Sequence, residues 1–225
     1  ASFEIKSPFL LGDQINLDTD FTRFYRKVVA SYKMPWLKNF PIRTVFQGYD
    51  NKYQQPIYIG SKKNLYEIKQ KGFLTSFENK KKFVSSALSI GFEKMRISKL
   101  EKNMATAIRL STDVIDKSIP YAFVEPSLFI DYLDDKINPT RGFFSLITFK
   151  GMVSSCHSLD FFKAVGEHAF FIPIFRPAVF ATRIRFGHIF IKDFSKLFPS
   201  ERFYLGGSNS LRGYFPDFAP PLGSY

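Results

Sequence analysis

The stretch that decides the fold is an alternating one: Val84-Ser85-Ser86-Ala87-Leu88-Ser89-Ile90-Gly91-Phe92-Glu93. In an extended strand, successive side chains point to opposite faces. Val84, Leu88, Ile90 and Phe92 therefore share one face, and mostly small residues occupy the other. A face exposed to bulk water would carry more charge. The pattern predicts a membrane-spanning strand with its apolar face toward lipid and its small face toward the interior of a barrel.

The same period of two recurs along most of the chain. Each run is about ten residues long, which is the length that crosses a bilayer as a tilted strand, whereas strands of soluble sandwiches are usually about five or six residues. Breakers separate the runs, most clearly at 134–142. The run at 160–174 alternates poorly, because Lys163 and Glu167 share a face with Val165 and Ala169. We expect strands at 12–26, 27–36, 41–55, 64–78, 83–97, 104–115, 119–133, 142–153, 160–174 and 178–191.

Composition limits the partners of the 225-residue chain. Aromatic residues make up 18% of it, with 28 Phe and 11 Tyr, and the net charge is +12. Such a surplus is compatible with nucleic acid, anionic lipid or lipopolysaccharide, acidic polypeptides, or simple solvation. No recognition helix, zinc finger or aromatic RNA-binding motif accompanies the charge, so nucleic acid is not expected. The basic clusters lie at expected strand ends, where lipid phosphate or solvent is the alternative: Lys62-Lys63, Lys80-Lys81-Lys82 and Lys94/Arg96/Lys99/Lys102.

Catalytic, metal and cofactor sites have little support in the sequence. His157, His168 and His188 show no metal-ligand spacing. Cys156 is the only cysteine, and its neighbour His157 would point to the opposite face of a strand. Asp131, Asp134 and Asp135 lie in or beside the expected turn, where exposure to solvent is a simpler role for them than catalysis or metal binding. We expect no enzyme, no metal and no cofactor.

A second informative stretch is Glu201-Arg202-Phe203-Tyr204-Leu205-Gly206-Gly207-Ser208-Asn209-Ser210-Leu211-Arg212-Gly213-Tyr214. The two adjacent glycines predict a tight turn. Arg212 then stands between apolar neighbours, which is unusual for a solvent loop. This arrangement suits a loop that folds inward and presents one planar cation to an acidic partner.

This stretch resembles the inward-folded loop of the BamA/TamA superfamily of outer-membrane barrels, also called the bacterial surface antigen family. The family pattern is an aromatic residue, a Gly-Gly turn, a short polar run, and an aliphatic residue followed by Arg-Gly-aromatic. Here Gly206 and Gly207 form the turn, and the last part reads Leu211-Arg212-Gly213-Tyr214, with Leu211 where Val or Ile is usual. The segment Phe9-Leu10-Leu11-Gly12-Asp13 and the turn Pro139-Thr140-Arg141-Gly142 also resemble family loops, and the latter faces the periplasm there.

The resemblance implies a fold and a location. The expected fold is all-β: part of an antiparallel transmembrane barrel, about ten strands of roughly sixteen, plus an inward-folded arginine loop. The whole chain, 1–225, would be barrel domain, with the loop at 192–225. We expect periplasmic repeats to precede it and further strands to follow it. The location implied is the outer membrane of a Gram-negative-type bacterium.

The resemblance also implies a function: insertion of nascent outer-membrane proteins, or translocation of polypeptide, without bond chemistry. In the family, a client strand adds to a weakly paired seam between the first and last strands. Implied partners are outer-membrane lipid, lipopolysaccharide, nascent outer-membrane proteins and accessory assembly subunits. A two-partner secretion transporter, a passive pore and a soluble basic module remain alternatives.

The alternation pattern identifies two further arginines as candidate functional residues. Arg183 and Arg185 share the polar face of the last expected strand before the loop. In a barrel they would line the interior. Two roles remain open for them: hydration of the lumen, or positioning of the loop or of a polypeptide in transit.

Overall fold

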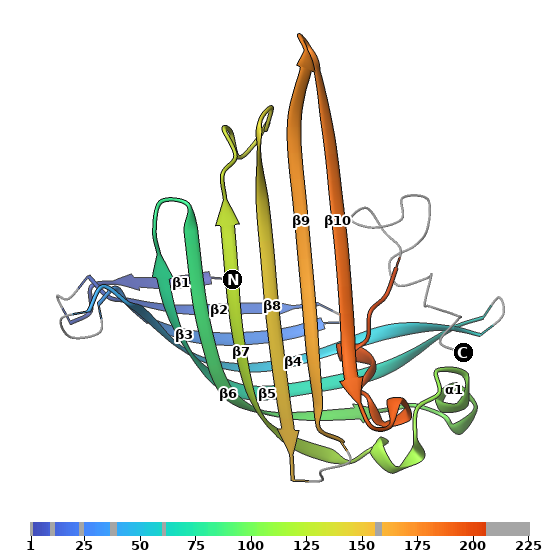
Figure 1. Ribbon diagram of the computed structural model, residues 1–225. Coiled ribbons are helices and arrows are strands. Elements are labelled where there is room, and N and C mark those ends of the chain that lie inside the picture. The colour runs from blue at the N-terminus through green and yellow to red at the C-terminus, as the bar shows by residue number, and fades with distance from the viewer. Residues whose placement is uncertain are drawn as a thin grey trace.

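A computed structural model describes residues 2–9, 12–22, 25–36, 40–59, 62–155 and 159–205. Ten strands form one antiparallel sheet in which each strand pairs with its neighbours in sequence (Figure 1). The strands are β1 (Ser2–Lys6), β2 (Gln14–Phe21), β3 (Tyr25–Met34), β4 (Arg43–Ile59), β5 (Lys62–Lys80), β6 (Val84–Ser98), β7 (Ser118–Asp131), β8 (Gly142–Ser154), β9 (Phe161–Phe175) and β10 (Ala178–Ile191). The expected all-β antiparallel fold is confirmed.

The sheet is strongly twisted and curls around a concave side. In Figure 1, β1 to β4 run across the view, whereas β8 to β10 rise steeply in front of them. Connections at 81–83, 132–141 and 176–177 lie at one end of the strands, which we call the turn end. The segments 99–117 and 192–205 lie at the other end, which we call the loop end.

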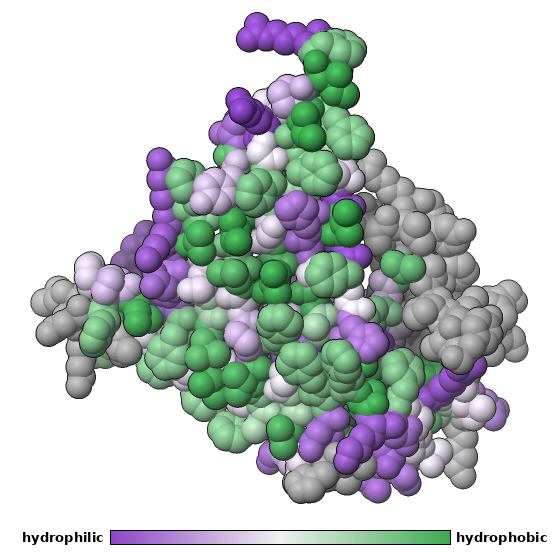
Figure 2. Space-filling view, in the orientation of Figure 1, coloured by the Kyte–Doolittle hydropathy of each residue, from purple (hydrophilic) through white to green (hydrophobic). Residues whose placement is uncertain are grey.

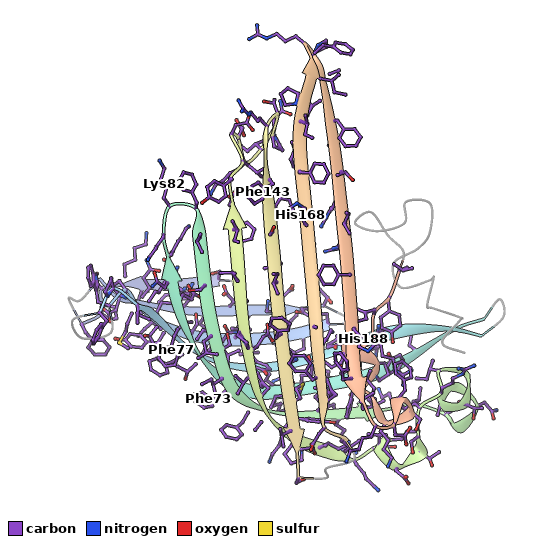
Figure 3. All side chains as sticks on the ribbon, viewed as in Figure 1. Phe73, Phe77, Lys82, Phe143, His168 and His188 are labelled. Carbon is purple, nitrogen blue, oxygen red and sulfur yellow. The ribbon has the colours of Figure 1, made fainter. Side chains whose placement is uncertain are left out.

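The convex face is apolar, as the alternation predicts. The register places Leu88, Ile90 and Phe92 of β6 on it, all more than a third exposed. Phe73 and Phe77 of β5 point away from the sheet on the same side (Figure 3). Figure 2 shows apolar side chains over most of the face formed by β6 to β10, with hydrophilic ones gathered near its lower edge. An exposed apolar sheet face of this extent is typical of a lipid-facing surface.

One expected strand is wrong, and one strand was missed. Residues 104–115 are not a strand: α1 (Lys102–Ala107) and a 3₁₀ turn, η1 (Thr112–Val114), occupy them. Ala105, Leu110 and Val114 are buried there, a spacing that fits a helix followed by a turn better than the period of two of a strand. Conversely, the short edge strand β1 was not among the expected strands, since the resemblance in this region concerned only the loop at 9–13. The turn expected at 134–142 is confirmed, and it precedes β8.

The concave face holds a core at the loop end. Side chains of β5 to β9 pack there against α1, η1 and the segment that follows β10. Ile68, Met95 and Ile97 are fully buried in this cluster, and Leu197 and Phe198 are only 1% exposed. The core therefore fastens both loop-end segments to the inner wall of the sheet. No helix among the described residues is long and apolar enough to cross a membrane.

Candidate functional site: the segment that docks inside the sheet

The chain turns back after β10 and lies against the concave face. Two short 3₁₀ turns, η3 (Phe194–Lys196) and η4 (Pro199–Glu201), build this docked segment, which we define as residues 192–205. Asp193 caps η3 by accepting from the Ser195 N–H and hydroxyl, and these hydrogen bonds lower the pKa of Asp193. Phe198 packs edge-on against Tyr121 of β7, with ring centroids 6.0 Å apart. The segment is thus anchored by apolar burial.

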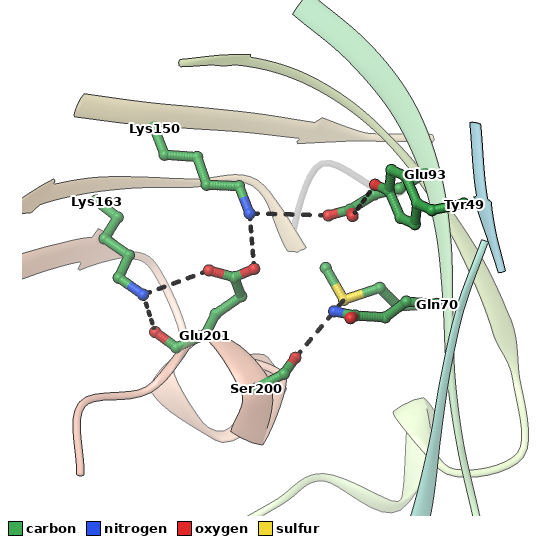
Figure 4. Close-up of polar contacts among 8 residues, drawn as sticks. Tyr49, Gln70, Glu93, Lys150, Lys163, Ser200 and Glu201 are labelled. Atoms are coloured by element: carbon green, nitrogen blue, oxygen red, sulfur yellow. Dashed lines mark hydrogen bonds and ion pairs between the residues drawn. The ribbon is translucent and has the colours of Figure 1, made fainter. Parts of the chain in front are cut away.

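A buried carboxylate adds an ionic anchor (Figure 4). Glu201 Oε1 lies 2.7 Å from Lys150 Nζ of β8, and Glu201 Oε2 lies 3.4 Å from Lys163 Nζ of β9. Lys163 also donates to the Glu201 carbonyl at 2.8 Å. The three side chains are 8–18% exposed. A buried charge is tolerated only when it is paired and hydrogen-bonded, and here each partner supplies that pairing.

The ionic anchor continues across the inner wall. Lys150 Nζ lies 3.8 Å from Glu93 Oε1 of β6, and the Tyr49 hydroxyl of β4 donates to Glu93 Oε2 at 2.7 Å. One polar network therefore links β4, β6, β8 and β9 to the docked segment. Because its members come from well-separated parts of the chain, it forms only in the folded sheet.

Arg202 joins the docked segment to the segment at 99–117. Its guanidinium donates to the carbonyl of Ile108, and to the carbonyl of Leu197 at 3.0 and 3.2 Å. It also lies over the Phe194 ring, 4.7 Å from the centroid. Burial lowers the pKa of Arg202. The planar guanidinium of an arginine presents five N–H donors in fixed directions, so it can satisfy several carbonyls on different segments, whereas a lysine ammonium has only three donors at one point.

Phe203 occupies the space above a glycine of β10. A Cβ atom on Gly187 would lie 2.4 Å from Phe203 Cζ, closer than real Cβ contacts allow. Lys163 Nζ also lies 5.0 Å from the Phe203 ring centroid. A larger residue at Gly187 would therefore displace the Phe203 ring from the wall.

The two arginines singled out from the sequence lie on the concave face. Arg183 and Arg185 of β10 both contact Glu167 of β9, at 2.7 and 2.6 Å, and each arginine side chain is about half exposed. Lys163, on the same face of β9, reaches Glu201 instead. These pairings explain why β9 alternates poorly: its charged residues face an interior that supplies partners.

The motif residues of the predicted arginine loop lie outside the described residues, as do Cys156 and His157. These motif residues are Gly206, Gly207, Leu211, Arg212, Gly213 and Tyr214. Sequence reasoning missed Glu201, Lys150 and Arg202 as anchoring groups. The only signal for such an anchor was the charge at Lys163 within a lipid-length strand. Within the described ranges, no cluster of His, Cys, Asp or Glu could hold a metal ion.

Comparisons with known proteins agree with this geometry. Residues 11–222 match the Omp85 superfamily domain. The fold matches the crystal structure of BamA from Haemophilus ducreyi lacking POTRA domains 1-3, with a TM-score of 0.78 over 96% of this chain at 15% sequence identity. This chain spans 42% of the length of that BamA chain. No match was found among curated protein sequences.

Proposed function

Because the chain belongs to the Omp85 superfamily, we propose that it forms barrel wall in a protein that inserts or translocates other polypeptides without bond chemistry. The family match and the shared fold place it in the outer membrane of a Gram-negative-type bacterium. Its surroundings there are outer-membrane lipid and lipopolysaccharide. Its clients are nascent outer-membrane proteins, and accessory assembly subunits are further partners.

The observation that carries the proposal is the docked segment. A passive pore needs an open lumen, whereas here residues 192–205 fill part of the concave side and are anchored by Glu201 and Arg202. Anchoring of this kind fixes the point at which the chain enters residues 206–214. We propose that the docked segment delivers Arg212 to the inner wall of the complete barrel.

The chemistry of the proposed task is hydrogen bonding, not catalysis. A strand that enters hydrocarbon must pair its backbone N–H and C=O groups, since each unsatisfied group costs several kcal/mol. A barrel edge supplies those partners when the client strand adds to it. We propose that the docked segment holds the barrel in the shape in which such an edge is available, with Arg212 paired to a carboxylate of the wall.

The test uses the full-length protein in cells. Arg212→Ala should lower the level of assembled outer-membrane clients, while the variant itself still inserts and keeps its heat-modifiable mobility. Arg212→Lys should also lower client levels substantially, because lysine retains the charge of Arg212 but lacks its planar fork. Wild-type client levels with both variants would contradict the proposed role of Arg212.

Client levels, measured together with ion conductance, separate assembly from a passive pore. If the protein is a passive pore, Arg212→Ala should raise ion conductance in planar bilayers and leave client levels unchanged. If it assembles or translocates polypeptides, client or cargo levels should fall whether or not conductance changes.

A further inference from the structure

We propose that the convex face of β5 to β8 carries a binding site for a phosphorylated lipid, with an acyl chain in an apolar groove and the phosphate on lysines at the loop end. The site lies on the opposite face from the docked segment. It therefore goes beyond the assembly function, and its test does not depend on client transport.

The groove is formed by one row of cross-strand neighbours on the convex face. Phe73 pairs with Phe92, Phe92 with Ala122, and Ala122 with Val153, so these four side chains stand side by side on the convex face. Ala122 is the small member of the row and leaves a furrow between Phe92 and Val153. The resulting groove has a volume of about 690 Å³.

The next rows toward the loop end are basic. Lys71 pairs with Lys94 and lines the same groove, and Lys69 pairs with Arg96 one row further on. The groove therefore changes from aromatic to cationic within two residues along β5 and β6. An acyl chain joined to an anionic headgroup has the same order of apolar and charged parts.

Glu67 gathers additional lysines beside the groove. Its carboxylate is 2% exposed and lies 3.1–3.3 Å from the ammonium groups of Lys52, Lys69 and Lys99. One carboxylate thus holds three cations close together, which leaves an excess of positive charge. Lys71 pairs with Asp50 at 2.9 Å, and Arg96 lies 3.7 Å from Asp116. Together with Lys94, these outward side chains form a patch with more basic than acidic residues. Its six basic members are Lys52, Lys69, Lys71, Lys94, Arg96 and Lys99, and its three acidic members are Asp50, Glu67 and Asp116.

The positive charge of this patch indicates which kind of ligand the groove binds. Ammonium groups clustered at a membrane interface attract phosphate-bearing lipids. The turn at 139–142 resembles one that faces the periplasm, so the loop end faces the cell surface. The outer leaflet there is built from lipid A, a glycolipid with several acyl chains and phosphate groups. We therefore assign the groove to lipid A and not to an acidic protein.

The test measures the lipids that the purified full-length protein retains. The protein in detergent is incubated with lipid A, with dephosphorylated lipid A and with phosphatidylethanolamine, and bound lipid is counted by native mass spectrometry. Lys71→Gln combined with Lys94→Gln should lower lipid A retention about tenfold. The matched control, Lys81→Gln combined with Lys82→Gln, removes the same charge at the turn end and should retain lipid A.

A second pair of variants tests the groove. Ala122→Trp should fill the furrow and expel the acyl chain, whereas Val124→Trp, two residues along the same face, should not. Equal retention of phosphorylated and dephosphorylated lipid A would overturn the proposal. So would retention by the double lysine variant at the wild-type level, or binding of an acidic peptide that the double variant loses while lipid A stays bound.

Discussion

Glu201 Oε1 lies 2.7 Å from Lys150 Nζ, although the two residues are 51 positions apart in the chain. The pair joins η4 to the inner wall of β8, and Lys163 of β9 completes it. This contact turns a loop that follows the last described strand into part of the barrel interior. We expect both the stability and the proposed function of the docked segment to depend on this contact.

The first prediction concerns this ion pair. Glu201→Gln keeps the shape of the side chain but removes the carboxylate shared by Lys150 and Lys163, and leaves Lys150 only the longer contact with Glu93. Removing one partner of a buried pair costs about 3–5 kcal/mol. We expect easier cleavage by trypsin after Arg202 and a lower free energy of unfolding in detergent. Glu101→Gln, an exposed residue of the loop end, is the control.

A double-mutant cycle makes the same prediction quantitative. With Lys150→Met and Glu201→Gln, the coupling free energy of two residues in contact should exceed about 1 kcal/mol. Additive effects of the two substitutions would show that the contact contributes nothing to docking.

The second prediction concerns the glycine beneath Phe203. Gly187→Val should push the Phe203 ring off β10 and destabilise the docked segment by about 1–3 kcal/mol, as overpacking does. Gly48→Val is the matched control, because nothing lies within 4 Å of a Cβ atom there. Fluorescence of a tryptophan placed at Phe203 reports the displacement. Equal responses to the two substitutions would argue against close packing at Gly187.

The third prediction tests which face meets the membrane. Leu88→Arg places a cation on the convex face and should cost about 2–4 kcal/mol if it lies near the bilayer midplane. Ala87→Arg points to the concave face and should cost much less. Folding into lipid vesicles under urea measures both. The assignment of the faces is wrong if the two variants are equally destabilised.

The fourth prediction concerns pH and the turn between β7 and β8. Hydrogen bonds from the Thr140 hydroxyl and the Arg141 N–H hold the pKa of Asp134 well below its usual range. A carboxylate with a lowered pKa stabilises the fold above its unfolded pKa of about 3.9, and this contribution is lost as the pH falls through the folded pKa. Asp134→Asn should therefore weaken amide-exchange protection of the turn at pH 7. The difference from wild type should shrink below about pH 4. A difference that stays constant with pH would assign the effect to side-chain shape instead of charge.

Several elements could be predicted from the sequence because their signal is local. The alternation at 83–97 identified β6 to within one residue, and the turn residues around Asp134 marked the start of β8. Residues 104–115 misled the same reasoning, since a short helix and a 3₁₀ turn can also carry apolar residues at even spacing. Tertiary burial of Ala105 and Leu110 against the core decided that segment.

The site was less predictable for a physical reason. Glu201 pairs with lysines 38 and 51 positions away, and such contacts leave no local pattern in a single sequence. The charges of Lys163 and Glu167 in a lipid-length strand were a visible anomaly, but their partners required the register of the sheet. The motif of the arginine loop is readable in the sequence, but its residues lie outside the described ones, so the inward-folded loop stays a prediction.

The most direct test of the central claim measures client assembly with the docked segment released. In cells whose only copy of the full-length protein carries Glu201→Gln, a loss of about 3–5 kcal/mol in docking would shift the ratio of docked to released segment by more than about a hundredfold. We predict that outer-membrane client levels fall while the variant itself is inserted at wild-type levels and keeps its heat-modifiable mobility. Wild-type client levels, with the segment shown by trypsin to be released, would contradict the claim that docking inside the sheet serves assembly.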